Sequence, residues 1–255
     1  MWQGDYLYLI ENLILKDFRV RYRNMSLGML WSLVNPLVMM GVLTFVFTRV
    51  FSNNAIPHYP VFVLCGMIPF NFFSIAWTSG TTSIIDNAGL VKRVPVPREI
   101  VPITTVLANC VHLLVQIALL LLLVFYFYGS NRQWIWLPLV WGLEVVFVSG
   151  LALLSSAVNV YIRDTRYIVE SANTVLFWLV PIIYDSAIVP QKYSGFYEIN
   201  PLAALVLTLR RILLQAEGPD GPTHTLWKFA GVSVAVFVFG LLFFHRMKPR
   251  FYEHI

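Results

Sequence analysis

Long runs without a charged residue are the feature that most limits what this chain can fold into. Three of them contain no Lys, Arg, Asp or Glu: Leu30–Thr48, Val61–Ile85 and Ile103–Tyr128. A fourth, Trp134–Ile162, contains only Glu144. About 20 apolar residues in a helix cross a hydrocarbon core about 30 Å thick. Only 12% of the 255 residues are charged, against about 25% in an ordinary soluble domain. The sequence therefore indicates an integral membrane protein and excludes a soluble enzyme.

Six segments are predicted to be transmembrane helices, because a helix satisfies its backbone polar groups within one segment. They are Met29–Phe51, Val61–Ile85, Ile103–Tyr128, Trp136–Val160, Tyr167–Tyr184 and Trp227–His245. We therefore expect an all-α integral membrane protein that forms a single transmembrane domain over residues 1–255. Its parts are an N-terminal segment (1–28), spans one to five (29–184), an outer loop (185–226), and span six with a tail (227–255).

Basic residues divide unequally between the two sides of the membrane. Twelve fall on the side that holds both chain ends: Lys16, Arg19, Arg21, Arg23, Lys92, Arg93, Arg98, Arg163, Arg166, Arg246, Lys248 and Arg250. Six fall on the other side: Arg49, Arg132, Lys192, Arg210, Arg211 and Lys228. Because cytoplasmic loops carry an excess of Lys and Arg, both termini are predicted to be cytoplasmic. Contact with membrane lipids explains the net charge of +5, and no nucleic-acid partner is expected.

The segment before the first span has its apolar residues at helical spacing and its charges on other faces. The apolar residues are Tyr6, Ile10, Leu13 and Ile14, and the charged ones are Glu11, Lys16, Arg19 and Arg23. This pattern predicts an amphipathic helix lying in the cytoplasmic interface of the membrane. A short soluble helix is the alternative.

The segment Pro201–Leu214 on the outer side is apolar but only 14 residues long, too short for a membrane span. Asn200 followed by Pro201 is a helix-start signal. We therefore predict a re-entrant or interfacial segment between spans five and six.

Motifs of ATP-binding, metal and catalytic sites are missing from the sequence. No glycine precedes G-K-[ST] at the spacing of a phosphate loop, and neither H-E-x-x-H nor C-x-x-C occurs. We expect no cofactor, metal or catalytic residue on this chain. The strongest polar candidates inside the spans are Glu144, His112 and Gln116, for which interhelical packing and substrate contact are equally open.

Aromatic residues away from the span ends form a second candidate set. They include Trp31, Phe70, Phe72, Phe73, Trp77 and Trp178. In a water-filled path, such rings offer flat platforms for the C–H faces of sugars. For any single ring, packing or lipid contact is the favoured interpretation.

The loop between the second and third spans is longer than a plain connection needs. It runs from Asp86 to Pro102 and contains four charged residues in Lys92–Glu99 together with Pro95, Pro97 and Pro102. Prolines fix the backbone and stiffen the return into the next helix. A rigid intracellular projection of this kind suits force transmission to a soluble partner, although a solvated loop is the alternative.

Four short motifs occur in order along the chain. They are Arg21–Arg23 with Ser26–Trp31 and Asn35-Pro36; Lys92–Pro102; Asn159–Asp164 with Pro181–Tyr184; and Asn200–Leu202 with Arg210. Together they resemble the permease subunits of ATP-binding-cassette polysaccharide exporters, which handle lipid-linked O-antigen, capsule or teichoic acid. The resemblance covers nearly the whole chain.

The resemblance implies a homodimer in the inner membrane, bound to two copies of a separate ATPase chain that carries ATP and Mg. The channel for the lipid-linked glycan would lie between the two copies of this chain. A drug or lipid exporter of the same fold is the alternative. A membrane-embedded enzyme or ion-coupled carrier built around Glu144, His112 and Gln116 is a less favoured one.

The resemblance also implies roles for individual residues. The expected ATPase-coupling residues are Arg19, Arg23, Asp86, Lys92, Arg93, Arg98, Glu99, Arg163 and Asp164. The candidates for the translocation path are Trp31, Phe70, Phe73, Trp77, His112, Gln116, Glu144 and Trp178. Short helices in the outer loop would form an outer gate with Asn200, Pro201, Arg210 and Arg211.

Overall fold

Helices account for nearly all of the part of the chain that the computed structural model describes, which is residues 6–23, 28–50, 56–93, 97–185, 200–214 and 224–251 together with 188 and 192. No β-strand occurs within these residues. Among them, five helical segments are long and apolar enough to cross a membrane: Trp31–Val50, Tyr59–Asp86, Ile100–Tyr128, Arg132–Tyr161 and Thr225–Arg250. The predicted all-helical membrane fold is therefore confirmed, and five of the six predicted spans are found as such helices.

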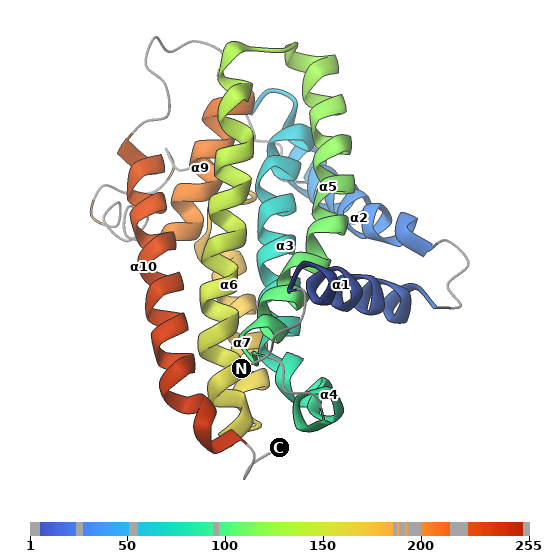
Figure 1. Ribbon diagram of the computed structural model, residues 1–255. Coiled ribbons are helices and arrows are strands. Elements are labelled where there is room, and N and C mark those ends of the chain that lie inside the picture. Colours follow the sequence, from blue (N-terminus) through green and yellow to red (C-terminus); the bar gives the residue numbers. More distant parts are fainter. Residues whose placement is uncertain are drawn as a thin grey trace.

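Four long helices stand side by side in the bundle of Figure 1. In order of packing they are α10 (His224–Met247), α6 (Leu137–Tyr161), α3 (Tyr59–Asp86) and α5 (Ile100–Tyr128). α3 lies in the middle and is the most deeply buried of the spans. Its neighbours therefore determine which of its side chains reach a surface.

The two ends of the bundle differ in charge. The end that we call the basic end holds the short helix α4 (Ala88–Arg93), the start of α5, and the turn η5 (Lys248–Arg250) that follows α10. It carries Lys92, Arg93 and Arg98. The opposite end holds the start of α3, the end of α5 and the turn η3 (Arg132–Trp136).

Small residues let three of these helices approach closely. A Cβ atom on Gly150 of α6 would lie 2.6 Å from the backbone of Phe237 in α10, and one on Gly240 would overlap the carbonyl oxygen of Gly150. A Cβ atom on Gly80 of α3 would lie 2.5 Å from the Cβ of Ala152 in α6. Backbone contact of this kind stabilises helix pairs in membranes. It fixes α10, α6 and α3 as one tightly packed unit.

The predicted N-terminal helix is present as α1 (Tyr6–Tyr22), which lies across the basic half of α5 in Figure 1. Lys16 of α1 donates a hydrogen bond to the side-chain oxygen of Asn87, at the junction of α3 and α4. Thr105 of α5 donates to the carboxylate of Asp17, with 3.3 Å between the oxygens. These contacts tie α1 to the loop that follows α3.

The first membrane-crossing helix has few contacts with the rest of its own chain. It consists of α2 (Trp31–Phe45) and a π-helical turn, η2 (Val46–Val50), and is preceded by η1 (Gly28–Leu30). Val38, Val42 and Phe45 are more than half exposed. Its apolar surface is therefore left for lipid or for another protein chain.

The fifth predicted span, Tyr167–Tyr184, is not confirmed as a membrane-crossing helix. The structure has α7 (Thr165–Leu179) there, with 15 residues, which measures about 22 Å at 1.5 Å per residue. Val180 is extended, with φ −86° and ψ 137°, because the residue before a proline avoids the helical region and Pro181 follows. The chain then continues without a helix through Tyr184.

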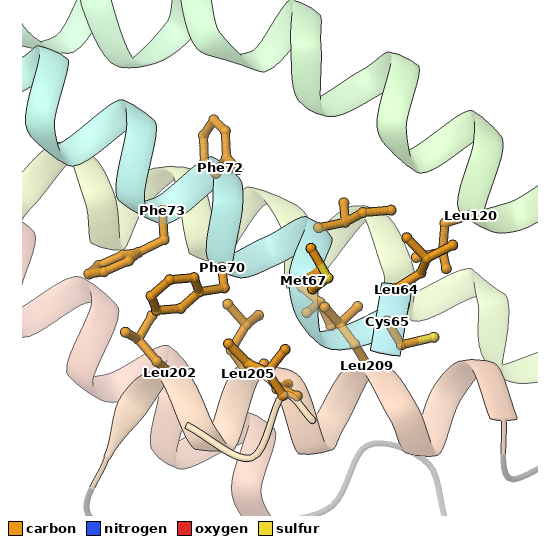
Figure 2. Close-up of a cluster of buried hydrophobic side chains, with 14 of the residues drawn as sticks. Leu64, Cys65, Met67, Phe70, Phe72, Phe73, Leu120, Leu202, Leu205 and Leu209 are labelled. Carbon is orange, nitrogen blue, oxygen red and sulfur yellow. The ribbon is translucent and has the colours of Figure 1, made fainter. Parts of the chain in front are cut away.

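The outer segment forms α9 (Pro201–Leu214), as the helix-start signal predicts. The side-chain oxygen of Asn200 accepts a hydrogen bond from the Leu202 amide at 3.0 Å. Figure 2 shows Leu202, Leu205 and Leu209 pointing toward Met67 and Phe70 of α3. α9 is thus packed against α3, and also against α10. Its location as a re-entrant segment stays a prediction.

We predict that Gly150→Ala destabilises the protein, because the added methyl group has to displace the backbone of α10. The expected loss is about 1–3 kcal/mol, as for other overpacked sites. Gly142→Ala, in the same helix but with open space around its Cβ position, is the matched control and should be neutral or stabilising. Thermal unfolding of the detergent-purified variants measures both, and equal midpoints would contradict the packing described here.

Candidate functional site

A groove opens between α2, α3 and α7, and its walls combine polar groups with aromatic rings. It encloses about 370 Å³. Its lining residues are Met39 of α2; Phe70, Ser74 and Thr78 of α3; and Glu170, Asn173, Thr174, Phe177 and Trp178 of α7. Polar side chains within a membrane bundle usually face a partner or a water-filled path. This groove is therefore the candidate functional site.

The groove continues toward the basic end. A second hollow of about 480 Å³ shares Ser74 and Thr78 with the first, and is further lined by Ile75, Ser79, Thr82, Asp86 and Arg166. The Thr82 hydroxyl donates to the Asp86 carboxylate at 2.6 Å. The Arg166 Nε donates to Glu170 at 2.9 Å. The polar surface thus runs from the basic end to the aromatic residues of α7.

Helical spacing explains how the sequence builds this surface. Ser74, Thr78, Thr82 and Asp86 are four residues apart, so they share one face of α3. On α7, residues 166, 170, 173, 174 and 177 share a face in the same way. The Asn173 amide donates to the Thr78 hydroxyl at 3.1 Å and joins the two faces.

The groove offers hydrogen bonds and ring surfaces rather than reactive groups. Hydroxyl, amide and carboxylate groups can donate to or accept from the hydroxyl groups of a ligand. Among the described residues there is no cluster of three or more His, Cys, Asp or Glu that could hold a metal ion. The arrangement suits a ligand that combines hydroxyl groups with apolar C–H faces.

The predicted aromatic path residues separate into three groups. Phe70 and Trp178 line the groove. Phe73 is 1% exposed, and its ring lies 6.1 Å from that of Phe147 and 5.3 Å from that of Trp77, so these rings pack in the core. Trp31 is 46% exposed on α2 and is not among the lining residues.

The three polar candidates inside the spans do not come together at the groove. The Gln116 amide donates to the Ser32 carbonyl at 2.8 Å and joins α5 to α2. Glu144 is fully buried in α6, and neither carboxylate oxygen has a hydrogen-bond partner among the described residues. His112 is partly exposed on α5. For Gln116, the structure favours interhelical packing.

The predicted coupling residues fall into two groups at the basic end. Most are exposed: Arg19, Arg23, Asp86, Lys92, Arg93, Arg163 and Asp164. Arg98 and Glu99 are only partly exposed and contact the chain's own C-terminal part, where Arg98 donates to the Lys248 carbonyl and Glu99 lies 3.5 Å from the Lys248 amine. Only the first group leaves its charges open to a partner.

At the opposite end, Arg210 of α9 binds the non-helical segment that follows α7. Its side chain is 5% exposed. One guanidinium nitrogen donates to the Ile182 carbonyl at 2.6 Å, and the other lies 3.4 Å from the Tyr184 carbonyl. The guanidinium also lies 3.5 Å from the centre of the Phe62 ring. The neighbouring Arg211 is exposed, so the two predicted gate arginines differ in role.

The hydroxyl and amide residues of the groove were not predicted from the sequence. The main ones are Ser74, Thr78, Asn173 and Thr174. The signal was present as polar residues four apart in two segments that are otherwise apolar. Aromatic residues alone were a weaker guide, because rings three positions apart on α3 divide between groove and core.

Known proteins resemble this chain over nearly its whole length. The model of the ABC-2 type transporter family matches residues 8–214. The O-antigen export system permease protein RfbA of Klebsiella pneumoniae is 32% identical over 251 residues, covering 98% of this chain and 94% of its own length. A protein of the same name from Myxococcus xanthus is 28% identical, over 98% of this chain and 96% of its own length. The polysialic acid transport protein KpsM of Escherichia coli is 26% identical, with 83% of each chain covered.

We predict that Arg210→Met destabilises the opposite end, because the Ile182 carbonyl loses its charged donor and stays buried. An unsatisfied buried group costs about 1–3 kcal/mol. Arg211→Met, one residue further along and exposed, is the matched control. Thermal unfolding in detergent should show a lower midpoint for the Arg210 variant alone, and an equal loss in both variants would argue against the role of Arg210.

Proposed function

The chain belongs to the ABC-2 type transporter family, and we propose that it is the membrane-spanning permease subunit of an ATP-driven exporter of a lipid-linked, O-antigen-like polysaccharide. Family membership makes the chain a membrane transport component rather than an enzyme, in agreement with the sequence prediction. Its relatives carry the names of O-antigen and polysialic acid export proteins, which supports a polysaccharide as the substrate.

The groove between α2, α3 and α7 is the observation that carries this proposal. Hydroxyl and amide groups from Ser74, Thr78 and Asn173 can exchange hydrogen bonds with successive sugar hydroxyls as a chain passes. Phe70 and Trp178 add ring surfaces for the C–H faces of sugars. Contacts of this kind are individually weak, so they let a long polymer slide.

A second copy of the chain would complete the path. The groove is open on one side, and α2, which supplies one of its walls, exposes an apolar surface that its own chain does not cover. Large exposed apolar surfaces mark protein or lipid contacts. We propose that two copies meet along α2 with their grooves facing, and that the channel lies between them.

We propose that the basic end faces the cytoplasm, because Lys and Arg are concentrated there. The inner membrane is proposed from the resemblance to O-antigen export permeases. Both termini are then cytoplasmic. We propose that α7, with about 22 Å of helix, and the buried non-helical residues after it together provide the remaining crossing, at the place of the fifth predicted span. Non-helical backbone is tolerated at membrane depth where protein covers it, and Val180 and Ile182 are fully buried.

The exposed charges at the basic end would contact the partner ATPase. Arg19 and Arg23 near α1, Asp86, and α4 with Lys92 and Arg93 form one surface. Lys16 ties α1 to the loop that contains α4, and Asp17 ties it to the start of α5. We propose that two ATPase chains, carrying ATP and Mg, bind here in the assembled dimer. Movement of this surface would then open and close the path.

At the opposite end, α9 would form the outer gate as a re-entrant helix. It begins at Asn200 and Pro201 and holds the segment after α7 through Arg210. Since this segment continues from a wall of the groove, a shift of α9 would change the outer end of the path.

We predict that Thr174→Trp blocks export, because an indole placed in the groove fills the space that the polymer needs. Val175→Trp is the matched control, since Val175 is exposed but does not line the groove. Surface polysaccharide on intact cells, labelled by periodate oxidation and hydrazide coupling, is the measurement. A decrease of about tenfold or more, equivalent to 1.4 kcal/mol, is expected for Thr174→Trp only; export at the wild-type level would refute the groove as the path.

We also predict that an ATPase chain containing a phosphate loop co-purifies with this protein in detergent. Lys92→Glu combined with Arg93→Glu should weaken that association, because it reverses two exposed charges on the proposed surface. Arg132→Glu, at the opposite end, is the control. Mass spectrometry of the purified complexes gives the ATPase content, and transport by an ATPase-free preparation would contradict the proposal.

A further inference from the structure

A second, smaller core lies at the basic end and joins parts of the chain that are far apart in sequence. Its buried members are Ile84, Val91, Val101, Leu153, Ala157, Val160, Phe244 and Phe251. They come from the ends of α3 and α10, from the second half of α6, from α4, from the start of α5 and from the residue after η5. The loop that is proposed to meet the ATPase is therefore packed on its inner side against the C-terminal part of the chain.

Phe251 lies within this core and brings the C-terminal segment into it. Although it lies just four positions before the last residue of the sequence, its side chain is fully buried. Its ring lies 5.3 Å from that of Phe244 and 6.0 Å from that of Tyr161. The guanidinium of Arg98 lies over the same ring, 6.0 Å from its centre. Burial of an aromatic ring stabilises the packing around it, so this segment is held in place.

Polar contacts hold the same segment from both sides. Arg98, just before α5, donates to the Lys248 carbonyl. Tyr161, at the end of α6, donates its hydroxyl hydrogen to the Met247 carbonyl at 2.9 Å. These are backbone carbonyls at the end of α10, where a helix leaves acceptors without partners. We call Arg98, Tyr161 and Phe251 the tail clamp.

The tail clamp connects the basic end to the opposite end through α10. α10 has 24 residues and therefore extends about 36 Å. It contacts α6 backbone to backbone at Gly150 and Gly240, so the two helices have no flexible side chains between them there. At its far end α10 packs along α9, where the Thr208 and Thr225 hydroxyls are 3.4 Å apart.

We propose that the tail clamp transmits movement of the ATPase-facing loop to α10, and through α10 to α9 at the opposite end. The proposal rests on the proposed function, since it needs a partner that moves the loop. In it, Arg98 and Phe251 are positioning residues: they bind neither the ATPase nor the glycan. Their contacts make the start of α5 and the end of α10 move together.

The test compares Phe251→Ala and Arg98→Gln with wild type in the complex of this protein with its ATPase. ATP-driven export by the wild-type complex is measured first. Arg98→Gln removes the contact to Lys248 without leaving a large cavity, so it decides the outcome if Phe251→Ala fails to accumulate. Phe239→Ala is the matched control, because Phe239 lies on the same helix and is 60% exposed. ATPase content, ATP hydrolysis in nanodiscs and surface polysaccharide on cells are measured for each variant.

Both clamp variants should keep their ATPase content and hydrolysis, while export per ATP falls roughly tenfold, the scale on which substitutions along a coupling network act. Phe251→Leu should recover most of the export per ATP, and the Phe239→Ala control should resemble wild type. Unchanged export per ATP, or a loss of ATPase binding that accounts for the loss of export, would overturn the tail clamp. A wild-type complex without ATP-driven export would instead overturn the proposed function.

Discussion

In a hydrocarbon environment every backbone amide and carbonyl has to be bonded within the protein, and the rest of this structure depends on that constraint. It accounts for the long helices of the bundle. It also restricts where the helices can stop. The chain leaves helical geometry after Leu179, and there the freed carbonyls of Ile182 and Ile183 accept hydrogen bonds from Arg210 and Tyr59. The break in α7 is therefore possible only where α9 and α3 supply donors.

The overall fold could be predicted well from the sequence, because the absence of charge over some twenty residues is a strong local signal. The end of α7 at Leu179 could not be predicted in the same way. Pro181 interrupts the helix locally, but the burial of the residues after it depends on Arg210, which is distant in the sequence. The close contact of Gly150 with Gly240 could not be predicted either, since the two glycines belong to different helices and meet only in the folded bundle.

Prediction of the site was less complete. The charged residues predicted to couple to the ATPase remain a prediction, and the sequence could not distinguish Lys92, which is exposed, from Arg98, which contacts the C-terminal part of the chain. For the groove, aromatic residues were predicted from the sequence, whereas the polar residues along one face of α3 and of α7 were not. An aromatic ring fits core and groove equally well, whereas a run of hydroxyl groups along one face of a membrane helix usually faces water or a polar partner. Polar periodicity was the better guide.

The pairing of Arg210 with Ile182 also affects the order in which the protein can be completed during synthesis. The two residues are 28 positions apart in the chain, and the carbonyl leaves the ribosome before its donor does. Until α9 has been made, the Ile182 carbonyl cannot exchange its hydrogen bond to water for the one from Arg210. The bend after α7 therefore cannot reach its final form before α9 has been made. The opposite end of the bundle is therefore completed only when α9, and then α10 that packs against it, have been made.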